Sequence, residues 1–362
     1  MGKLYLGHEL TPGSRLLRPL RDSSGHVLLQ TGTILTERYL ELIEQWGLQD
    51  ALLLAQRPSE ARIYDHVTRT HIIDAVLQTT IIDQLADIFN NITSEKALPI
   101  ATLRNSAALL VREIVAHKHV ALDLSALRNL DEKTFTHSLS VAVFAIASGV
   151  ELGLQEPVLM ELAMGALLHD LGKIKVAPAI LNKPSSLSAA EREIIQQHPR
   201  WGVELLQERG YQTSNVLLAI YEHHERCDGS GYPFGLYDTQ ISQIGKITAV
   251  ADFYDALTSN RAYRSAVVPH LVVEELIANS LTLFNSDIVW AFVRSLALYP
   301  VGSIVLLDNG ERGEVIGYDR EMPNRPRVLV THDATDRELE PPFEYDLTQQ
   351  LNRFIVKVES AT

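Results

Sequence analysis

A histidine and an aspartate stand side by side in the stretch Gly165-Ala-Leu-Leu-His-Asp-Leu-Gly-Lys173, directly after a long apolar run. The run from Val158 to Leu168 is apolar nearly all round a helix, which predicts that this helix is buried. A buried His-Asp pair is costly unless a partner balances it, and a metal ion is one such partner. His169 and Asp170 therefore raise the question of whether the rest of the chain supplies further metal ligands.

Five further residues of the same region have side chains that bind metals. Any one of them, alone in an apolar helix, would more often be structural than a ligand. They stand at predicted helix ends or inside apolar runs: His137, His198, His223, His224 and Asp252. Imidazole and carboxylate groups without thiolates suit Fe, Mn, Zn or Co. Together with His169 and Asp170 they make seven potential ligands, which is more than one tetrahedral ion can bind. They suit two ions, which about 3.5–4 Å apart form a clamp for displacement at phosphorus.

Basic residues near the predicted ligands fit a phosphate substrate. Lys173 follows His169 by four residues, so both side chains share a face if the helix continues past Gly172. Arg261 and Arg264 follow the last apolar run, and guanidinium groups bind phosphate bidentately. The alternative is that both arginines are surface residues at a helix end.

A glycine-rich loop, Asp228-Gly-Ser-Gly-Tyr-Pro-Phe-Gly235, follows the histidine pair. Gly231 and Tyr232 belong to this loop. The tyrosine hydroxyl suits a phosphate and its ring suits stacking on a base. A Gly-Tyr-Pro sequence is also compatible with a plain turn. We expect the loop to contribute to substrate binding.

The elements that must position these residues are mainly helical. Residues 123–299 form the predicted helical catalytic domain, in which Ser188 and Glu191 make a capping box before a helix. Residues 61–122 are predicted to be a helical linker with helices at 66–94 and 101–119. The apolar stripes of these helices predict packing on the next domain, and they leave open a homodimer formed through residues 66–119.

Smaller modules are predicted at both ends of the chain, so that the fold class is mainly α with α/β and β additions. Residues 1–60 indicate a small α/β module, with strands near 26–29 and 32–34 and a helix over 36–46 that Gly47 closes. Residues 300–362 indicate a small β appendage. Its predicted elements are a hairpin at 303–318 and strands at 327–331 and 354–358.

The composition limits the class of protein. The chain has 362 residues, 46% of them hydrophobic, with one cysteine and a net charge of −13. A single cysteine excludes an internal disulfide framework, and no apolar run is long enough to predict a membrane span. The acidic charge argues against binding to nucleic acid or to an anionic membrane. It is compatible with a small anionic substrate, because a local cluster of metal, Lys and Arg can outweigh it. We expect a soluble, cytoplasmic protein.

The ordered series of motifs resembles the HD-GYP family of the HD phosphohydrolase superfamily, over residues 130–270. The resemblance lies in His169-Asp170, in His223-His-Glu-Arg-Cys-Asp-Gly-Ser-Gly-Tyr-Pro233, in Lys183-Pro184, in His198-Pro199 and in Val250-Ala-Asp-Phe-Tyr-Asp-Ala-Leu-Thr258. It implies an HD-type helical domain and a phosphodiesterase that opens cyclic di-GMP to linear pGpG and can go on to GMP. It also implies a bi- or trinuclear metal centre, often of iron, with manganese also used.

The resemblance implies roles for single residues as well. The implied metal ligands are His137, His169, Asp170, His198, His223, His224 and Asp252. Asp170 would bridge the ions, and Asp170 and Lys173 would be the catalytic residues. The residues implied to contact the substrate are Lys173, Gly231, Tyr232, Arg261 and Arg264. Some relatives have lysine at the last of these positions, so Arg264 keeps the charge with a different geometry.

One departure from the family pattern bears on the metal count. Trinuclear relatives carry a glutamate four residues before the first ligand histidine, and this chain has Lys133 there. Glu132 is one residue away, which is about 100° around a helix. We therefore expect two divalent ions, most often iron, with manganese as the other candidate. Cys227 stands where an aromatic residue is common, which we interpret as a minor variation of the loop.

Two other functions fit parts of the sequence. A cyclic di-GMP receptor that signals through partners with little turnover would share the fold. Degenerate relatives of that kind usually lose metal ligands or the loop motif, and this chain retains both. A di-iron oxygenase would use a similar helical scaffold, but the Gly-Tyr-Pro loop favours a nucleotide.

Overall fold

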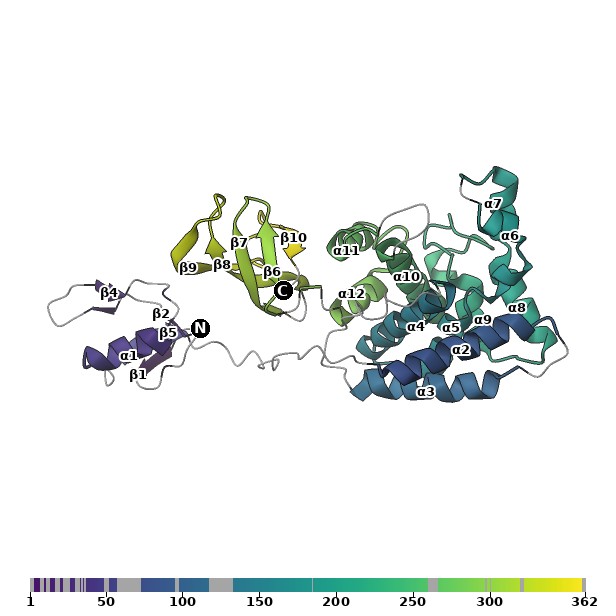
Figure 1. The fold of residues 1–362 in the computed structure, drawn as a ribbon, viewed down its shortest axis with the longest axis horizontal. Helices are drawn as coiled ribbons and strands as arrows, with labels where there is room; N and C mark the ends of the chain where they lie inside the picture. The colour runs from purple at the N-terminus through teal and green to yellow at the C-terminus, as the bar shows by residue number, and fades with distance from the viewer. Residues whose placement is uncertain are drawn as a thin grey trace. The chain divides into compact units, whose positions relative to one another are not determined.

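The structure is a computed structural model of the chain (Figure 1). It describes residues 3–6, 10, 14–16, 20–21, 27–29, 33, 35, 37–48, 52–56, 73–94, 98–116, 133–183, 185–259, 266–296, 298–299, 301–319 and 322–359. The contacts divide the chain into two compact units, Met1–His66 and Val67–Thr362. The predicted domain boundaries near residues 60, 122 and 299 stay predictions. None of the helices in the described residues is long and apolar enough to cross a membrane.

The first unit contains short strands and one helix. The sheet order β1-β5-β2 joins β1 (Lys3–Leu6), β5 (Leu52–Gln56) and β2 (Arg15–Leu16), and β3 (Leu20–Arg21) pairs with β4 (Val27–Leu29). Helix α1 (Glu37–Gln45) is followed by Gly47, whose φ of 69° is the left-handed conformation that ends helices. The strand predicted near 26–29 and the helix predicted over 36–46 are confirmed. The strand predicted near 32–34 lies largely outside the described residues.

The second unit is mainly helical up to residue 296, as predicted. Its helices are α2 (Ala75–Asn91), α3 (Ile100–Ala116), α4 (Lys133–Glu151), α5 (Glu156–Leu168), α6 (Pro178–Leu181), α7 (Ala189–Ile195), α8 (His198–Glu208), α9 (Ser214–Glu222), α10 (Gln243–Thr258), α11 (Pro269–Ala278) and α12 (Ser286–Ser295), with 3₁₀ turns η3 (Leu171–Lys175) and η4 (Asp238–Gln240). Helix α5 is buried along its second half and packs against α3, α4 and α9. Gly165 permits the close approach of α9, because a Cβ at this position would lie 2.4 Å from the Ala219 Cβ.

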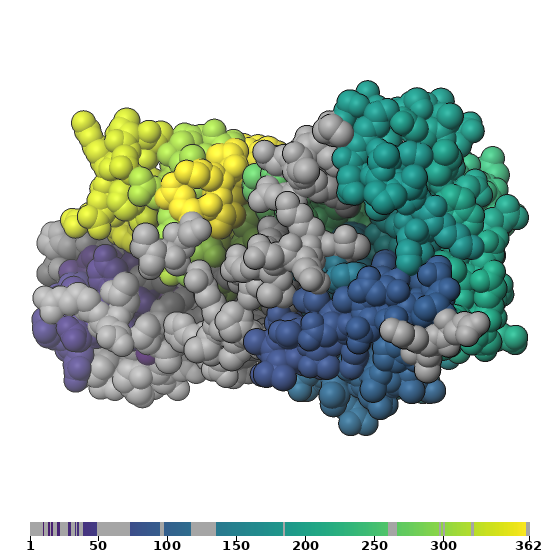
Figure 2. All heavy atoms as spheres, turned by 45° about the vertical axis from the view of Figure 1, so that its right-hand side comes forward, coloured from purple at the N-terminus to yellow at the C-terminus, as the bar shows by residue number. Residues whose placement is uncertain are grey.

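The first helix of the pair before this core is shorter than predicted. Asp74 accepts hydrogen bonds from the backbone N–H groups of Val76 and Leu77, so α2 begins at Ala75. The predicted segments 66–72 and 117–119 lie outside the described residues. Both helices pack on α4, and α3 also packs on α5, as the apolar stripes predict. The space-filling view shows them (blue) on the surface of the second unit (Figure 2).

A five-stranded antiparallel sheet follows the helices, in the order β10-β6-β7-β8-β9. Its strands are β6 (Ile304–Leu307), β7 (Arg312–Asp319), β8 (Met322–His332), β9 (Glu338–Asp346) and β10 (Ile355–Glu359). The predicted hairpin and both further predicted strands are confirmed. The sequence pattern does not predict β9, because Pro341 and Pro342 interrupt it. As an edge strand with no buried residue, β9 tolerates both prolines.

Candidate metal centre

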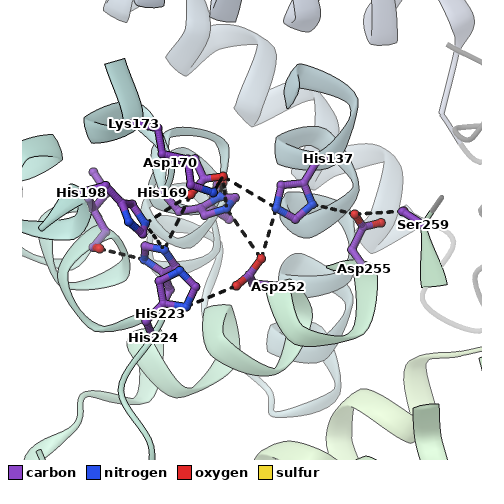
Figure 3. Close-up of polar contacts among 12 residues, drawn as sticks. His137, His169, Asp170, Lys173, His198, His223, His224, Asp252, Asp255 and Ser259 are labelled. Atoms are coloured by element: carbon purple, nitrogen blue, oxygen red, sulfur yellow. Dashed lines mark hydrogen bonds and ion pairs between the residues drawn. The ribbon is translucent and has the colours of Figure 1, made fainter. Parts of the chain in front are cut away.

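Seven side chains from the helical region point toward one buried centre (Figure 3). They are His137 in α4, His169 and Asp170 after α5, His198 at the start of α8, His223 and His224 after α9, and Asp252 in α10. They form two groups, and within each group one ligand atom of every residue lies within 4.8 Å of the others. The first group is His137, His169 and Asp252, and the second group is Asp170, His198, His223 and His224. The structure thus brings together every residue that the sequence analysis names as a ligand.

Asp170 faces both groups with different oxygen atoms. Its Oδ1 lies 3.4 Å from His198 Nε2 and 3.9 Å from His223 Nε2. Its Oδ2 lies 3.5 Å from His169 Nε2 and 3.9 Å from His137 Nε2. A carboxylate in this position can contact one cation in each group.

Asp252 also spans the two groups. Its Oδ1 lies 3.1 Å from His137 Nε2 and 3.9 Å from His169 Nε2, both in the first group. Its Oδ2 lies 3.8 Å from His224 Nδ1, in the second group. The two groups are therefore halves of one centre with two carboxylates between them.

Three of the histidine rings leave a bare nitrogen at this centre. The Nδ1 atoms of His169, His198 and His223 lie 2.7, 2.8 and 2.8 Å from the carbonyl oxygens of Ala166, Ile195 and Ile220. Because a carbonyl only accepts hydrogen bonds, each Nδ1 carries the proton, and a neutral ring then has a lone pair on Nε2. The Nε2 atoms of His198 and His223 lie 3.1 Å apart. Lone pairs at this distance repel each other, whereas two nitrogens bound to one ion at about 2.0–2.1 Å are separated by a similar distance.

The protonation states also fit a divalent cation. Burial acts to raise the pKa of Asp170, but the charge of Lys173 and the neighbouring histidines hold it well below its usual range. Burial lowers the pKa of His223 well below its usual range, so this ring is neutral. Burial also acts to lower the pKa of His137, but hydrogen bonds with Asp252 and Asp255 raise it to about 10. The carboxylates of Asp252 and Asp255 thus favour a proton on His137, and a metal ion would balance the same negative charge.

Two buried atoms of the centre have no hydrogen-bond partner within the described part of the chain, His169 Nε2 and Asp170 Oδ1. Unpaired buried polar atoms are costly, and ligation of a cation would satisfy both. Neutral imidazoles with ionised carboxylates are donors that suit iron, manganese or zinc. The residues present therefore fit a divalent metal centre.

Lys173 reaches the centre, although the helix before it does not continue past Gly172. Helix α5 ends at Leu168 and the 3₁₀ turn η3 follows, so no continuous α-helix joins His169 to Lys173. In a 3₁₀ turn, residues three apart lie above one another. Lys173 accordingly lies above Asp170, and its Nζ is 2.6 Å from Asp170 Oδ2. Its side chain is 27% exposed, which leaves the ammonium open to a ligand from solvent.

The glycine-rich loop lies against the second group of ligands. The Tyr232 ring stacks on the His224 ring, with 4.6 Å between ring centroids and 27° between ring planes. The Tyr232 backbone N–H donates to the His224 carbonyl oxygen at 3.2 Å. Gly231 lets the loop fold back, because a Cβ there would lie 2.4 Å from the backbone nitrogen of Arg226. The predicted loop residues thus border the centre.

Two buried carboxylates that the sequence analysis misses support these residues. Glu225 accepts hydrogen bonds from the backbone N–H groups of Phe234 and Leu236, at 2.7 and 2.9 Å, and so holds the loop closed. Asp255 lies 2.6 Å from His137 Nδ1. The available signals are the position of Glu225 next to the histidine pair and of Asp255 three residues after Asp252.

Three residues of the sequence analysis stay untested. Arg261 and Arg264 lie outside the described residues. Lys133 is the first residue of α4 and stands one turn before His137, but its side chain is likewise outside the described part.

Comparison with known proteins defines the class of this chain. Residues 110–288 match the family model described as "HD domain", and residues 304–362 match the model described as "KOW domain associated with HD domain". In fold, the chain is similar to Bd1817, an HDG"Y"P protein from Bdellovibrio bacteriovorus, with a TM-score of 0.50 and 17% identity. This match covers 81% of this chain and 98% of that chain. The chain thus contains an HD domain followed by a KOW domain of the kind associated with HD domains.

The curated relatives narrow the class further. Over 245 residues the chain is 36% identical to the cyclic di-GMP phosphodiesterase PA4108 of Pseudomonas aeruginosa, a match that covers 67% of this chain and 59% of that protein. Over 219 residues it is 30% identical to 3'3'-cGAMP-specific phosphodiesterase 2 of Vibrio cholerae, covering 60% and 42%. Together with the HD-domain match, these relatives confirm the resemblance to the HD-GYP family. The chain spans less than two thirds of the length of these curated relatives.

Proposed function

We propose that this chain is a metal-dependent phosphodiesterase that hydrolyses cyclic di-GMP to linear pGpG, with GMP as the further product if the second bond is also hydrolysed. Relatives named cyclic di-GMP phosphodiesterases support the substrate. The observation that carries the proposal is the position of Asp170, whose two oxygens face the two groups of ligands. This arrangement suits two cations that share a carboxylate, as in two-metal sites for displacement at phosphorus.

Each group of ligands would hold one divalent ion, iron or manganese, with Asp170 as the bridge. Lys133 at the position of the third-ion glutamate supports two ions per chain rather than three. When bound, the ions would lower the pKa of a water molecule and stabilise negative charge on the phosphate.

The protein's own side chains would bind and orient the substrate. Lys173 lies at the edge of the centre and can donate a hydrogen bond to a non-bridging phosphate oxygen while it stays close to Asp170. Positive charge fixed at this place stabilises charge that develops during displacement. Tyr232 presents its ring beside His224, where a guanine base could stack. Arg261 and Arg264 are proposed as further phosphate ligands on sequence alone.

The test is anaerobic reconstitution of metal-free protein with Fe²⁺ or Mn²⁺, followed by chromatography of the products from cyclic di-GMP. We expect pGpG as the first product, with or without further hydrolysis to GMP, and close to two ions per chain. Asp170→Ala should lose metal and activity together. As a control, Asp346→Asn alters a carboxylate of the C-terminal sheet that accepts hydrogen bonds from Thr348, and it should retain both. Normal turnover by Asp170→Ala would refute the assignment.

A receptor with little turnover is the alternative, and the same experiment separates the two. Binding of cyclic di-GMP without product at full metal loading would favour the receptor. A firm count of three ions per chain would contradict the two-metal centre but leave hydrolysis possible.

The identity of the cyclic dinucleotide needs its own measurement, because three relatives of the chain are named 3'3'-cGAMP-specific phosphodiesterases. Parallel turnover of cyclic di-GMP and 3'3'-cGAMP by the same preparation gives the ratio of kcat/KM. We expect this ratio to favour cyclic di-GMP. A ratio that favours 3'3'-cGAMP would change the substrate and keep the reaction.

A further inference from the structure

The histidines of the centre do not share one kind of hydrogen-bond partner. His169 and His223 each directly follow a helix, and His198 follows α7 by three residues. Each donates from Nδ1 to a carbonyl oxygen in the last turn of the preceding helix. Carbonyl groups in the last turn have no partner inside their helix. One hydrogen bond therefore caps the helix end and orients the ring.

His137 is different because it lies inside a helix. It is the fifth residue of α4, so no free helix-end carbonyl is available to its ring. Its Nδ1 lies instead 2.6 Å from Asp255 Oδ2, on α10. Asp255 is one turn after Asp252 on the same helix, and its side chain is 6% exposed. Ser259 Oγ also donates to Asp255 Oδ2, at 3.3 Å.

The His137 ring therefore lies between two carboxylates of one helix (Figure 3). Its Nδ1 faces Asp255, and its Nε2 faces Asp252 Oδ1 at 3.1 Å. Asp255 belongs to neither group of candidate ligands. Its contact is with the far side of the ring, so it acts on the centre through His137.

A carboxylate acceptor has a stronger effect than a carbonyl. It holds the proton on Nδ1, keeps the Nε2 lone pair directed at the centre, and makes the imidazole a better donor. In the first group one histidine has this anionic partner. In the second group, both His198 and His223 have neutral carbonyl partners.

We infer that Asp255 is a positioning residue that acts through His137 and strengthens metal binding by the first group of ligands, making the two metal positions unequal. The inference rests on the proposed two-metal centre. Loss of the Asp255 charge should weaken one of two ions and leave the other unchanged. Loss of a partner of this kind typically lowers metal affinity about 10- to 100-fold.

The experiment is titration of metal-free protein with Mn²⁺, monitored by calorimetry and by the EPR signal of free Mn²⁺. Asp255→Asn keeps the shape and one acceptor oxygen but removes the charge. We expect one Mn²⁺ to bind about 10- to 100-fold more weakly than in the wild type, and the other to bind with unchanged affinity. Asp346→Asn is the matched control and should bind both ions as the wild type does.

A double variant separates positioning from general damage to the fold. If Asp255 acts through His137, adding Asp255→Asn to His137→Gln should cause no further loss of Mn²⁺ affinity. The inference is overturned if Asp255→Asn weakens both ions equally or neither, or if its effect adds fully to that of His137→Gln. Should the wild type bind fewer than two Mn²⁺ ions, the two-metal centre fails first. The thermal unfolding of the metal-free variants checks that both fold.

Discussion

Replacing Gly172 by alanine tests how the fold places the metal ligands. Gly172 lies in η3, between Asp170 and Lys173, and packs against the start of α8. A Cβ at this residue would lie 1.9 Å from the carbonyl oxygen of His198 and 2.5 Å from the backbone nitrogen of Gly202. Ordinary van der Waals contact begins at 3.4 Å, so η3 and α8 would have to separate by about 1.5 Å, which is the difference between 3.4 Å and the 1.9 Å to the His198 oxygen.

Such a separation is large on the scale of metal coordination. Ligand distances tolerate changes of only about 0.2 Å, and Asp170 and His198 lie on opposite sides of this contact. We expect Gly172→Ala to lose at least one ion after anaerobic loading. Turnover of cyclic di-GMP should fall about 100-fold or more, since a misplacement of about 1 Å has an effect of this size. Overpacking should also lower the free energy of unfolding by about 1–3 kcal/mol.

Gly202→Ala is the matched control, because it adds the same methyl group from the other side of the same contact. Its Cβ would lie 3.0 Å from Ile220 Cγ2 and 3.2 Å from the Gly172 backbone nitrogen, so the neighbours need to move by only a few tenths of an ångström. Metal content, turnover and thermal unfolding should stay close to wild type. If Gly172→Ala keeps two ions and normal turnover, or if both variants are equally impaired, the steric reasoning is refuted.

Three further predictions concern the loop, the cysteine and the metal. In Glu225→Gln the side chain has one acceptor oxygen for two backbone donors, and hydrogen bonds to charged groups contribute about 1.5–3 kcal/mol. Steady-state kinetics should therefore show a KM about tenfold higher or more, with the metal content unchanged. An unchanged KM would contradict the role of Glu225. Burial and the nearby Asp238 raise the pKa of Cys227 to about 12. Since only the thiolate reacts, alkylation of Cys227 in the native protein at pH 8 should be roughly a thousandfold slower than alkylation of a free cysteine, and it should accelerate as the pH rises toward 12. Rapid labelling at pH 8 would contradict the buried environment of Cys227. Removal of metal by a chelator should lower the melting temperature by several degrees, because a metal ion at a concentration of about 100 times its Kd adds about 2.7 kcal/mol to the free energy of unfolding. An unchanged melting curve would mean that the ions do not stabilise the fold.

The sequence predicts the residues of the candidate metal centre better than it predicts the residues that support them. All seven candidate ligands that the structure brings together could be named in advance, because metal binding depends first on residue type and because helix ends can be recognised from apolar runs and glycines. The sequence does not indicate which acceptors the histidine rings bond, although the carbonyl groups that His169, His198 and His223 use lie only three residues earlier in the chain. The mainly α fold and the C-terminal hairpin follow from periodicity and turn residues.

The remaining features depend on contacts between distant parts of the chain. His137 and Asp255 are 118 residues apart, and no local pattern indicates that their helices lie side by side. The steric role of Gly172 requires knowledge of where α8 begins relative to η3. The position of Lys173 depends on a 3₁₀ turn, which apolar periodicity does not distinguish from the end of an α-helix. Strand β9 escapes prediction because its prolines are tolerated only at a sheet edge.

The charge of the centre reconciles an acidic chain with an anionic substrate. The chain has a net charge of −13, yet the proposed substrate, cyclic di-GMP, carries two phosphodiester charges. The buried carboxylates Asp170, Asp252 and Asp255 contribute three negative charges. Two divalent ions would contribute four positive charges and Lys173 one more, which leaves two positive charges at the centre. Because these charges are buried and close together, they act on a bound phosphate much more strongly than exposed charges screened over a distance of about 8–10 Å. This positive charge at the centre comes from the ions, because without them the three carboxylates outweigh Lys173. The centre would therefore attract the substrate only after metal is bound.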